Sequence, residues 1–193
     1  MTKQEQIDKL GNTIIYLADR MENLSKTKLL KLIYLLDEYA VKKFGIPFFG
    51  FNYEVWRLGP VCQEVFAELN AEEEELTVLD RFITLDRQDN TTYIKSKREF
   101  NDDEFSTNDL KLLEEVTTSF KNTTANQLID ITHQKGSLWY NVALKNDLLE
   151  PFDKKFKNTS NYEIQFEELI KQDQVKANLY HDYKEFTTFT KAF

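Results

Sequence analysis

The sequence predicts a mainly α fold (α+β), built as a single helical domain with a small antiparallel β element and a C-terminal helical extension. Five glycines and three prolines among 193 residues leave long stretches without helix breakers. Apolar residues recur at helical spacing near the N-terminus, and two short β-prone runs flank a turn near the middle of the chain. We place the helical domain at residues 1–150 and the extension, packed on the same domain, at residues 151–193.

The first two helices follow from apolar periodicity and from end signals. The first helix presents one apolar stripe, which consists of Ile7, Leu10, Ile14, Leu17, Ala18 and Met21. The second begins after Ser25, a suitable N-cap, and is apolar on most of its circumference between Leu29 and Leu36. Gly45 suits the left-handed residue that ends a helix, and Pro47 follows it. We expect this second helix to be the central one.

The stretch NYEVWRLGPVCQEVFAEL, residues 52–69, changes from strand-like to helix-like. Alternation through Tyr53 and Val55 predicts a short strand. Gly59 and Pro60 then fit the N-cap and the first position of a third helix, because that first position does not need the N–H that proline lacks. The buried face of this helix would consist of Val61, Val65, Phe66 and Leu69. The sequence thus predicts a corner between a strand and a helix.

Turn and capping signals place the elements that follow. Two β-prone runs, 81–86 and 91–96, flank a turn at Asp89 and Asn90 and predict a hairpin. Two capping boxes and a capping serine predict the starts of three helices: Ser106 with Asp109, Thr124 with Gln127, and Ser137. A last helix within residues 173–193 carries an apolar stripe of Val175, Leu179, Tyr183 and Phe186.

The net charge argues against DNA or RNA as a partner. The formal charge is -8, and most of the deficit lies in residues 67–105, which hold five basic and twelve acidic side chains. Such a surface repels phosphate, and no cluster of lysine and arginine with interleaved aromatic residues is visible. The acidic run Glu72–Glu75 is expected to be solvated surface, and a patch that captures a basic partner is the alternative.

Location follows from two further features. No apolar run reaches the roughly 20 residues that a membrane helix needs, and the N-terminal sequence lacks the apolar core of a signal peptide. The single cysteine, Cys62, cannot form an internal disulfide, which agrees with a reducing compartment. These observations predict a protein without membrane contact that is located in the cytoplasm.

Catalytic, cofactor-binding and metal-binding residues are not predicted. His133, His181 and Cys62 do not supply the cluster of close ligands that zinc needs. Neither a nucleophile elbow nor a glycine-rich phosphate loop occurs. Cys62 is interpreted as a small buried residue, although a helix N-terminus could lower the pKa of its thiol. We therefore expect no enzyme and no bound cofactor.

One corner gathers the candidate functional residues. Arg57 beside Gly59 and Pro60 leaves anion binding open, but a plain structural corner is favoured because proline removes one N–H donor. His133 and Trp139 lie on either side of a glycine turn. We expect a hydrogen-bonded structural histidine, and a tryptophan whose indole N–H fastens the turn.

Two blocks of sequence carry a resemblance to a known family. The first block combines a K-L-x-K-L-x-Y helix, a Gly and Pro, and W-x-x-G-P-V; it comprises Lys28, Leu29, Lys31, Leu32, Tyr34, Gly45, Pro47, Trp56, Gly59, Pro60 and Val61. The second block, LIDITHQKGSLWYNVA, contains Leu128, Thr132, His133, Ser137 and Trp139. In this order the blocks cover residues 25–145 and resemble the Panacea antitoxin domain family, the phage-associated SocA-like group. Leu138 stands where proline is common in that family.

The resemblance implies a mainly helical domain that neutralises a toxin, encoded by an adjacent gene, through direct protein–protein binding and without enzymatic activity. The residues that would bind the partner or mark the domain are Trp56, Arg57, Gly59, Pro60, His133 and Trp139. The alternative is a small-ligand-binding protein or an enzyme that uses Arg57, Cys62 and His133. A DNA-binding repressor is disfavoured by the charge, and homo-oligomerisation is left open.

Overall fold

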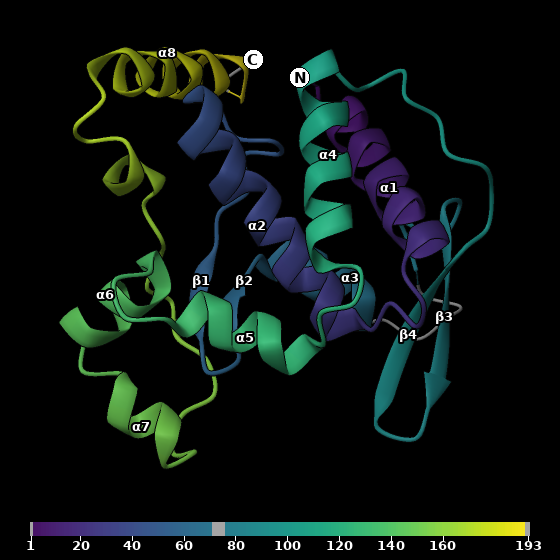
Figure 1. Cartoon of the computed structure of the whole chain (residues 1–193), viewed down its shortest axis with the longest axis horizontal. Helices are drawn as coiled ribbons and strands as arrows, with labels where there is room; N and C mark the ends of the chain where they lie inside the picture. The colour runs from purple at the N-terminus through teal and green to yellow at the C-terminus, as the bar shows by residue number, and fades with distance from the viewer. Residues whose placement is uncertain (1, 71–75, 192–193) are drawn as a thin grey trace.

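The computed structural model describes residues 2–70 and 76–191, which form helices and two small sheets (Figure 1). The predicted mainly α fold with a small β element is confirmed. The α-helices of this part of the chain are α1 (Lys3–Arg20), α2 (Lys26–Phe44), α3 (Gln63–Asn70), α4 (Thr107–Phe120), α5 (Ala125–His133), α6 (Leu138–Lys145), α7 (Leu149–Asp153) and α8 (Gln174–Lys191). The antiparallel strand pairs are β1 (Glu54–Trp56) with β2 (Gly59–Val61), and β3 (Ile83–Gln88) with β4 (Thr91–Ser96). A short 3-10 helix, η2 (Phe166–Leu169), precedes α8.

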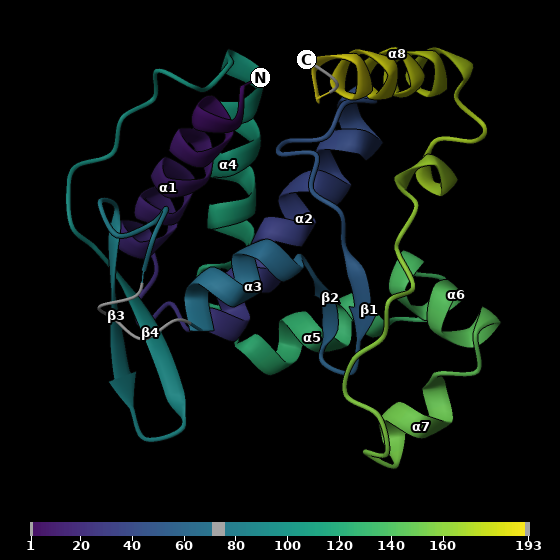
Figure 2. The same ribbon diagram turned by 180° about the vertical axis from the view of Figure 1, so that it is seen from behind.

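Helix α2 runs through the middle of the molecule, where α3, α4, α5, α8 and η2 pack against it (Figures 1 and 2). Leu32 and Leu36 are fully buried because other elements cover most of the circumference of this helix. The hydroxyl of Ser25 accepts a hydrogen bond from the Lys28 N–H at 3.2 Å and caps the helix start. Gly45, with φ +73°, ends it. The predicted central helix is therefore confirmed at both ends.

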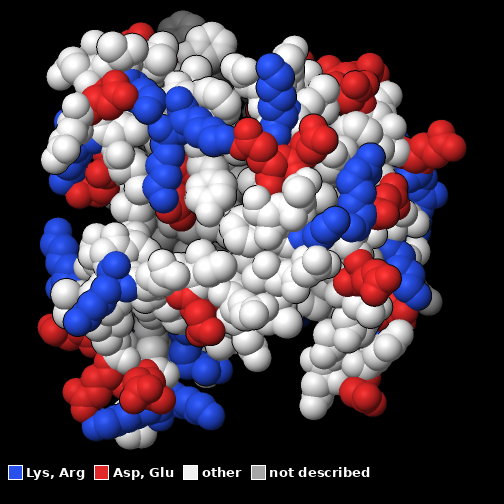
Figure 3. Space-filling model, in the orientation of Figure 1, with Lys and Arg blue, Asp and Glu red and all other residues white. Residues whose placement is uncertain are grey.

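Basic and acidic side chains are intermixed on the face of the molecule that Figure 3 shows, and no continuous basic stripe crosses that face. The acidic run Glu72–Glu75 lies outside the described residues, so its position on the surface stays a prediction. Of the helices within residues 2–70 and 76–191, none combines the length and the apolar content that crossing a bilayer requires.

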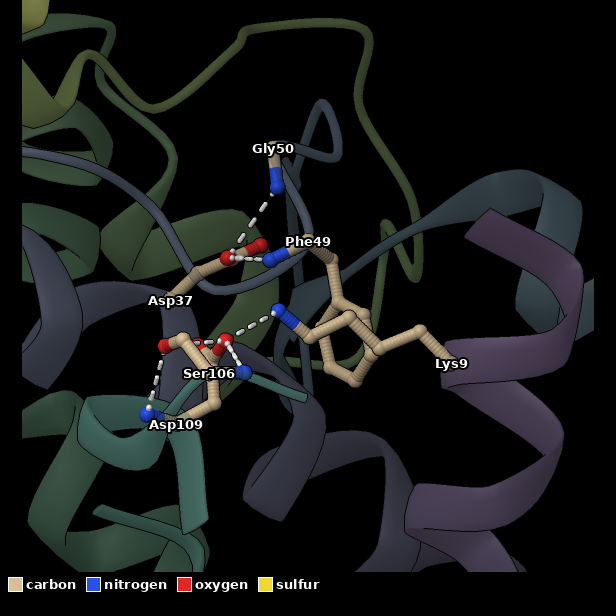
Figure 4. Close-up of polar contacts among 6 residues, drawn as sticks. All are labelled: Lys9, Asp37, Phe49, Gly50, Ser106 and Asp109. Carbon is tan, nitrogen blue, oxygen red and sulfur yellow. Dashed lines mark hydrogen bonds and ion pairs between the residues drawn. The ribbon is translucent and has the colours of Figure 1, made fainter. Parts of the chain in front are cut away.

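Helices α1 and α4 lie side by side, next to the β3–β4 hairpin (Figures 1 and 2). Lys9 of α1 reaches the start of α4, where its Nζ lies 3.0 Å from a carboxylate oxygen of Asp109 (Figure 4). The same Nζ lies 4.3 Å from the ring centre of Phe48. Asp109 also forms the predicted capping box with Ser106. One buried cation thus joins the two helices at a cap that the sequence predicts.

The β3–β4 hairpin is confirmed. Its pairing ends with Gln88 opposite Thr91, so Asp89 and the asparagine after it form a two-residue turn. Asp89 takes φ +51°, which matches the left-handed backbone that tight hairpin turns use. The Ile94 N–H donates to the Leu24 carbonyl at 2.9 Å and ties the hairpin to the loop between α1 and α2.

The predicted strand-to-helix corner is wrong at Gly59 and Pro60, which begin β2 instead of a helix. Gly59 pairs with Trp56 across a two-residue connection, and its φ of +102° differs from the extended conformation of an N-cap residue. Pro60 is tolerated because β2 lies at the edge of a two-stranded sheet. Helix α3 therefore begins four residues later than Gly59, at Gln63.

The segment after α7 runs alongside β1. The Val55 N–H donates to the Tyr162 carbonyl at 2.9 Å, and the Ile164 N–H donates to the Tyr53 carbonyl at 2.8 Å. The Ser160 hydroxyl donates to the Val55 carbonyl at 2.5 Å. The C-terminal segment therefore satisfies backbone groups of β1 that β2 does not reach.

Helix α8 lies across the C-terminal end of α2 (Figures 1 and 2). The helix is confirmed, but the apolar stripe that contains Val175 and Phe186 is largely exposed, whereas Tyr180 is buried. Tyr183 is half-buried, and its hydroxyl lies against Gly50, where an added side chain would collide with it. Helix α8 thus docks through its tyrosines, because the glycine leaves room for the end of the Tyr183 side chain.

Candidate functional site

The corner residues come together where the β1–β2 hairpin meets the end of α5 and the start of α6. The indole N–H of Trp139 donates to the Trp56 carbonyl at 2.9 Å and fastens the hairpin to α6. Trp139 is 4% exposed, and Gly59 and Pro60 are buried as well. These three residues therefore hold the corner together from the inside.

His133 stacks on Trp139 within the corner. The ring centres are 3.6 Å apart and the ring planes differ by 13°. The Nε2 of His133 is buried and has no hydrogen-bond partner among the described residues, so the predicted hydrogen bond is missing at this nitrogen. Burial, together with the charge of Lys31, lowers the pKa of His133 to about 4. The imidazole is therefore neutral at pH 7 and packs as an uncharged aromatic ring against the indole of Trp139.

Lys31 lies beneath the hairpin and is 1% exposed. Its Nζ donates to the Pro60 carbonyl at 2.7 Å. Burial lowers the pKa of Lys31 to about 7. Lys31 is not among the site candidates predicted from the sequence, although a signal is present there: it is the one charged residue between Leu29 and Leu36 of the central helix.

Gly59 allows the hairpin to approach Lys31 closely. A Cβ atom at this position would lie 2.9 Å from Cε of Lys31 and 2.9 Å from Oγ1 of Thr132. The φ of +102° also falls in a region that residues with side chains rarely adopt. The Gly-Pro step is therefore explained by close packing over a buried lysine.

The tip of the hairpin forms the outward part of the corner. Arg57 is half-buried, and its Nε donates to Oδ1 of Asn158 at 2.6 Å, while its backbone N–H donates to the Asn158 carbonyl at 2.9 Å. Leu58 is 45% exposed. Trp56 is half-buried against Phe66, with the ring centres 4.8 Å apart. The corner thus presents a guanidinium beside apolar surface.

Cys62 directly precedes α3 and is buried. Burial raises the pKa of its thiol to about 11, which outweighs the effect of the neighbouring helix N-terminus. A cysteine nucleophile needs a thiolate, and its base needs an imidazole that accepts a proton readily. The pKa of Cys62 is raised and that of His133 is lowered, which is the reverse of what a thiolate and its base require. These groups therefore do not form an activated pair.

Asp37, a second buried charged residue of α2, holds the chain segment that leads from this helix to the corner. Asp37 is fully buried, and its carboxylate accepts hydrogen bonds from the N–H groups of Phe49 at 2.6 Å and Gly50 at 3.1 Å (Figure 4). The Tyr53 hydroxyl donates to the same carboxylate at 2.7 Å. Burial raises the pKa of Asp37, and these donors oppose the rise. The carboxylate therefore holds the turn that leads from α2 into β1.

The described part of the chain has a trio of side chains close enough to share a metal ion. The ligand atoms of His181, Asp182 and Glu185 lie within 4.8 Å of one another on α8. All three side chains are exposed, and His181 and Glu185 form an i,i+4 pair at 3.8 Å. We assign no metal to this trio, because such groupings are common on exposed helices.

Comparison with known proteins identifies a family. A family model described as "Antitoxin SocA-like, Panacea domain" matches residues 29–140. The match begins in α2, includes the whole β1–β2 hairpin and ends just after Trp139, so it contains the corner residues described above except Asn158. No curated protein and no solved structure matches the chain. Because the family match spans more than half of the sequence, this protein belongs to the SocA-like Panacea antitoxin family.

Proposed function

We propose that this protein is an antitoxin, located in the cytoplasm, that neutralises a toxin encoded by an adjacent gene by binding it directly. The family match over residues 29–140 is the observation that carries this proposal. The chemistry of the corner agrees with binding instead of catalysis, because Cys62 and His133 do not form an activated pair. The net charge of -8 disfavours DNA as the target.

We further propose the hairpin tip as part of the toxin-binding surface. This surface, here called the tip surface, consists of Trp56, Arg57, Leu58 and Tyr162. Tyr162 is 42% exposed and lies beside β1, where its carbonyl accepts the Val55 N–H. Aromatic residues and arginine are enriched among the side chains that dominate binding energy at interfaces. The Trp139 and Lys31 contacts beneath the hairpin would keep this surface in a fixed shape before binding.

Co-expression with the product of the neighbouring reading frame tests the proposal. We expect growth to be restored, and the two proteins to purify together with a buried interface of about 1,200 to 2,000 Å². Failure of both growth rescue and co-purification would contradict the antitoxin function.

A matched pair of variants tests the tip surface separately. Arg57→Glu with Leu58→Glu places two carboxylates on the hairpin tip, and we expect binding to weaken at least about tenfold. Leu144→Glu with Lys145→Glu makes the same chemical change on the exposed end of α6 and should bind like the wild type. Equal affinity of the two double variants would place the toxin elsewhere, while leaving the antitoxin function intact.

A further inference from the structure

An open cavity of about 670 Å³ lies between the α1–α2 loop, β4 and the turn that joins α4 to α5. Its lining includes Arg20, Asn23, Lys28, Tyr93, Lys121 and Thr123. The β3–β4 hairpin projects from the body beside this place (Figure 1), and the outline of the molecule is notched between the hairpin and the body (Figure 3). The cavity lies at the start of α5, whereas the corner lies at the end of the same helix.

The cavity is cationic in a protein that is acidic as a whole. Three basic side chains line it, Arg20, Lys28 and Lys121, against one carboxylate, that of Glu22. The chain as a whole carries a formal charge of -8. A local positive site of this kind attracts an anionic group and orients it against the repulsion of the remaining surface.

The three basic residues are not neutralised within the described parts of the chain, where none of them forms an ion pair with a carboxylate. The Arg20 guanidinium lies 3.6 Å from the ring centre of Tyr16 and donates to the Tyr16 carbonyl at 3.3 Å. The Lys28 Nζ donates to the Lys121 carbonyl at 2.8 Å. Their positive charges therefore remain available to a ligand.

Lys28 gives the strongest reason to expect an anion. It is only 5% exposed, and burial lowers the pKa of its ammonium group. A buried ammonium group that contacts a neutral carbonyl keeps much of its desolvation cost, whereas a carboxylate partner offsets that cost. Lys9, which is also buried, has such a partner, because its Nζ lies 3.0 Å from a carboxylate oxygen of Asp109. Lys31, like Lys28, contacts a backbone carbonyl, but it lies beneath the β1–β2 hairpin and does not line this cavity.

We infer that this cavity receives aspartate or glutamate side chains of the toxin, so that an acidic segment of the partner inserts beside the β3–β4 hairpin. This inference rests on the proposed antitoxin function and names the chemistry of a second contact with the same partner. A carboxylate is favoured over a nucleic-acid phosphate, because the cations line one pocket of an acidic protein and no continuous basic stripe crosses the face that Figure 3 shows.

A peptide titration tests the cavity without the toxin. Hexaglutamate is added to the full chain at low salt and followed by amide chemical shifts, with hexaglutamine as the neutral control. We expect shift changes at residues that line the cavity, such as Asn23 and Thr123, and weaker binding as salt screens the charges. Inorganic phosphate, titrated in parallel, reports whether any small anion binds equally well.

Charge-reversal variants locate the binding. Arg20→Glu with Lys121→Glu should weaken hexaglutamate binding at least about tenfold, whereas Lys3→Glu with Lys145→Glu makes the same change in net charge away from the cavity and should have little effect. Circular dichroism verifies that both variants fold. The milder pair Arg20→Gln with Lys121→Gln should lie between the wild type and the reversed variant.

The outcomes separate the inference from the proposed function. Binding that is lost in the cavity variants and kept in the control supports the inference. No hexaglutamate binding at millimolar concentration, equal binding by both reversed variants, or binding of phosphate alone overturns it. Co-purification with the toxin tests the antitoxin function independently of these measurements. A negative result for the cavity therefore does not contradict the antitoxin function.

Discussion

Lys31 is a buried base and His133 a half-buried one, both near the β1–β2 hairpin, and burial disfavours the protonated form of each. The pKa of Lys31 is lowered to about 7, from an ordinary value of about 10.4. The pKa of His133 is lowered to about 4, from about 6.5. In both cases the unfolded chain binds more protons between the two values, so the free energy of unfolding rises with pH. The window for His133 is about pH 4 to 6.5, and that for Lys31 begins near pH 7.

Replacement of Lys31 by methionine should flatten the pH dependence of stability. Between pH 7 and 9 the wild-type free energy of unfolding should rise by up to about 1.4 kcal/mol per pH unit because of this one group. Urea unfolding of wild type and Lys31→Met at several pH values measures the two slopes. Lys145→Met, at an exposed position, serves as the control and should keep the wild-type slope. Identical slopes for wild type and Lys31→Met would show that Lys31 stays protonated in the fold.

At the scale of the elements, local signals predict helix starts well and long-range pairing poorly. Ser25, Ser106, Thr124 and Ser137 cap helices as predicted, because a cap depends on residues three positions away. The prediction of a helix start at Gly59 and Pro60 is wrong, because a Gly-Pro step fits the second strand of a hairpin as well as a helix start. The Trp139 and Lys31 contacts that accompany the hairpin are distant in sequence.

The β1–β2 hairpin should depend on Gly59 for space as well as for backbone conformation. Gly59→Ala combines an unfavourable φ with contacts at 2.9 Å, and we expect it to cost about 2 to 4 kcal/mol of stability. Gly136 has φ +87° but no atom within 4 Å of its would-be Cβ, so Gly136→Ala isolates the conformational cost, about 1 kcal/mol. Chemical denaturation compares the two. Equal losses would mean that the close approach to Lys31 has no energetic weight.

Periodicity predicts that a helix forms but not always which side it buries, as α8 shows. Of the predicted stripe, Val175, Leu179 and Phe186 are exposed and only Tyr183 is half-buried, whereas Tyr180, which the stripe does not include, is buried. Adjacent stripes on one helix share the same period, and the space beside Gly50 that receives Tyr183 is created by a loop distant in sequence. The site shows the same limit: His133 and Trp139 can be placed at one corner from the sequence, because a glycine turn joins them, but Lys31 lies beneath that corner only through the tertiary fold.

At the scale of the whole molecule, we propose that residues 1–150 and 151–193 fold as one unit. The C-terminal segment contributes buried Ile164, Phe166 and Tyr180 and supplies hydrogen bonds along β1. Removal of residues 151–193 should therefore lower the midpoint of thermal unfolding by at least about 10 °C, since burial of several large apolar side chains is lost. Calorimetry of the full chain and of the shortened chain measures the difference. An unchanged midpoint would show that the extension is an independent addition.

The corner has a spectroscopic consequence. Trp56 and Trp139 are the only two tryptophans in the sequence, and a hydrogen bond joins them at the hairpin. Indole emission under selective excitation therefore originates from this corner, with Trp139 stacked on a neutral imidazole. A ligand seated on the hairpin tip perturbs that emission, whereas a ligand at the other end of α5 is remote from both indoles. The protein thus carries a built-in optical reporter that distinguishes its two proposed binding faces without any added label.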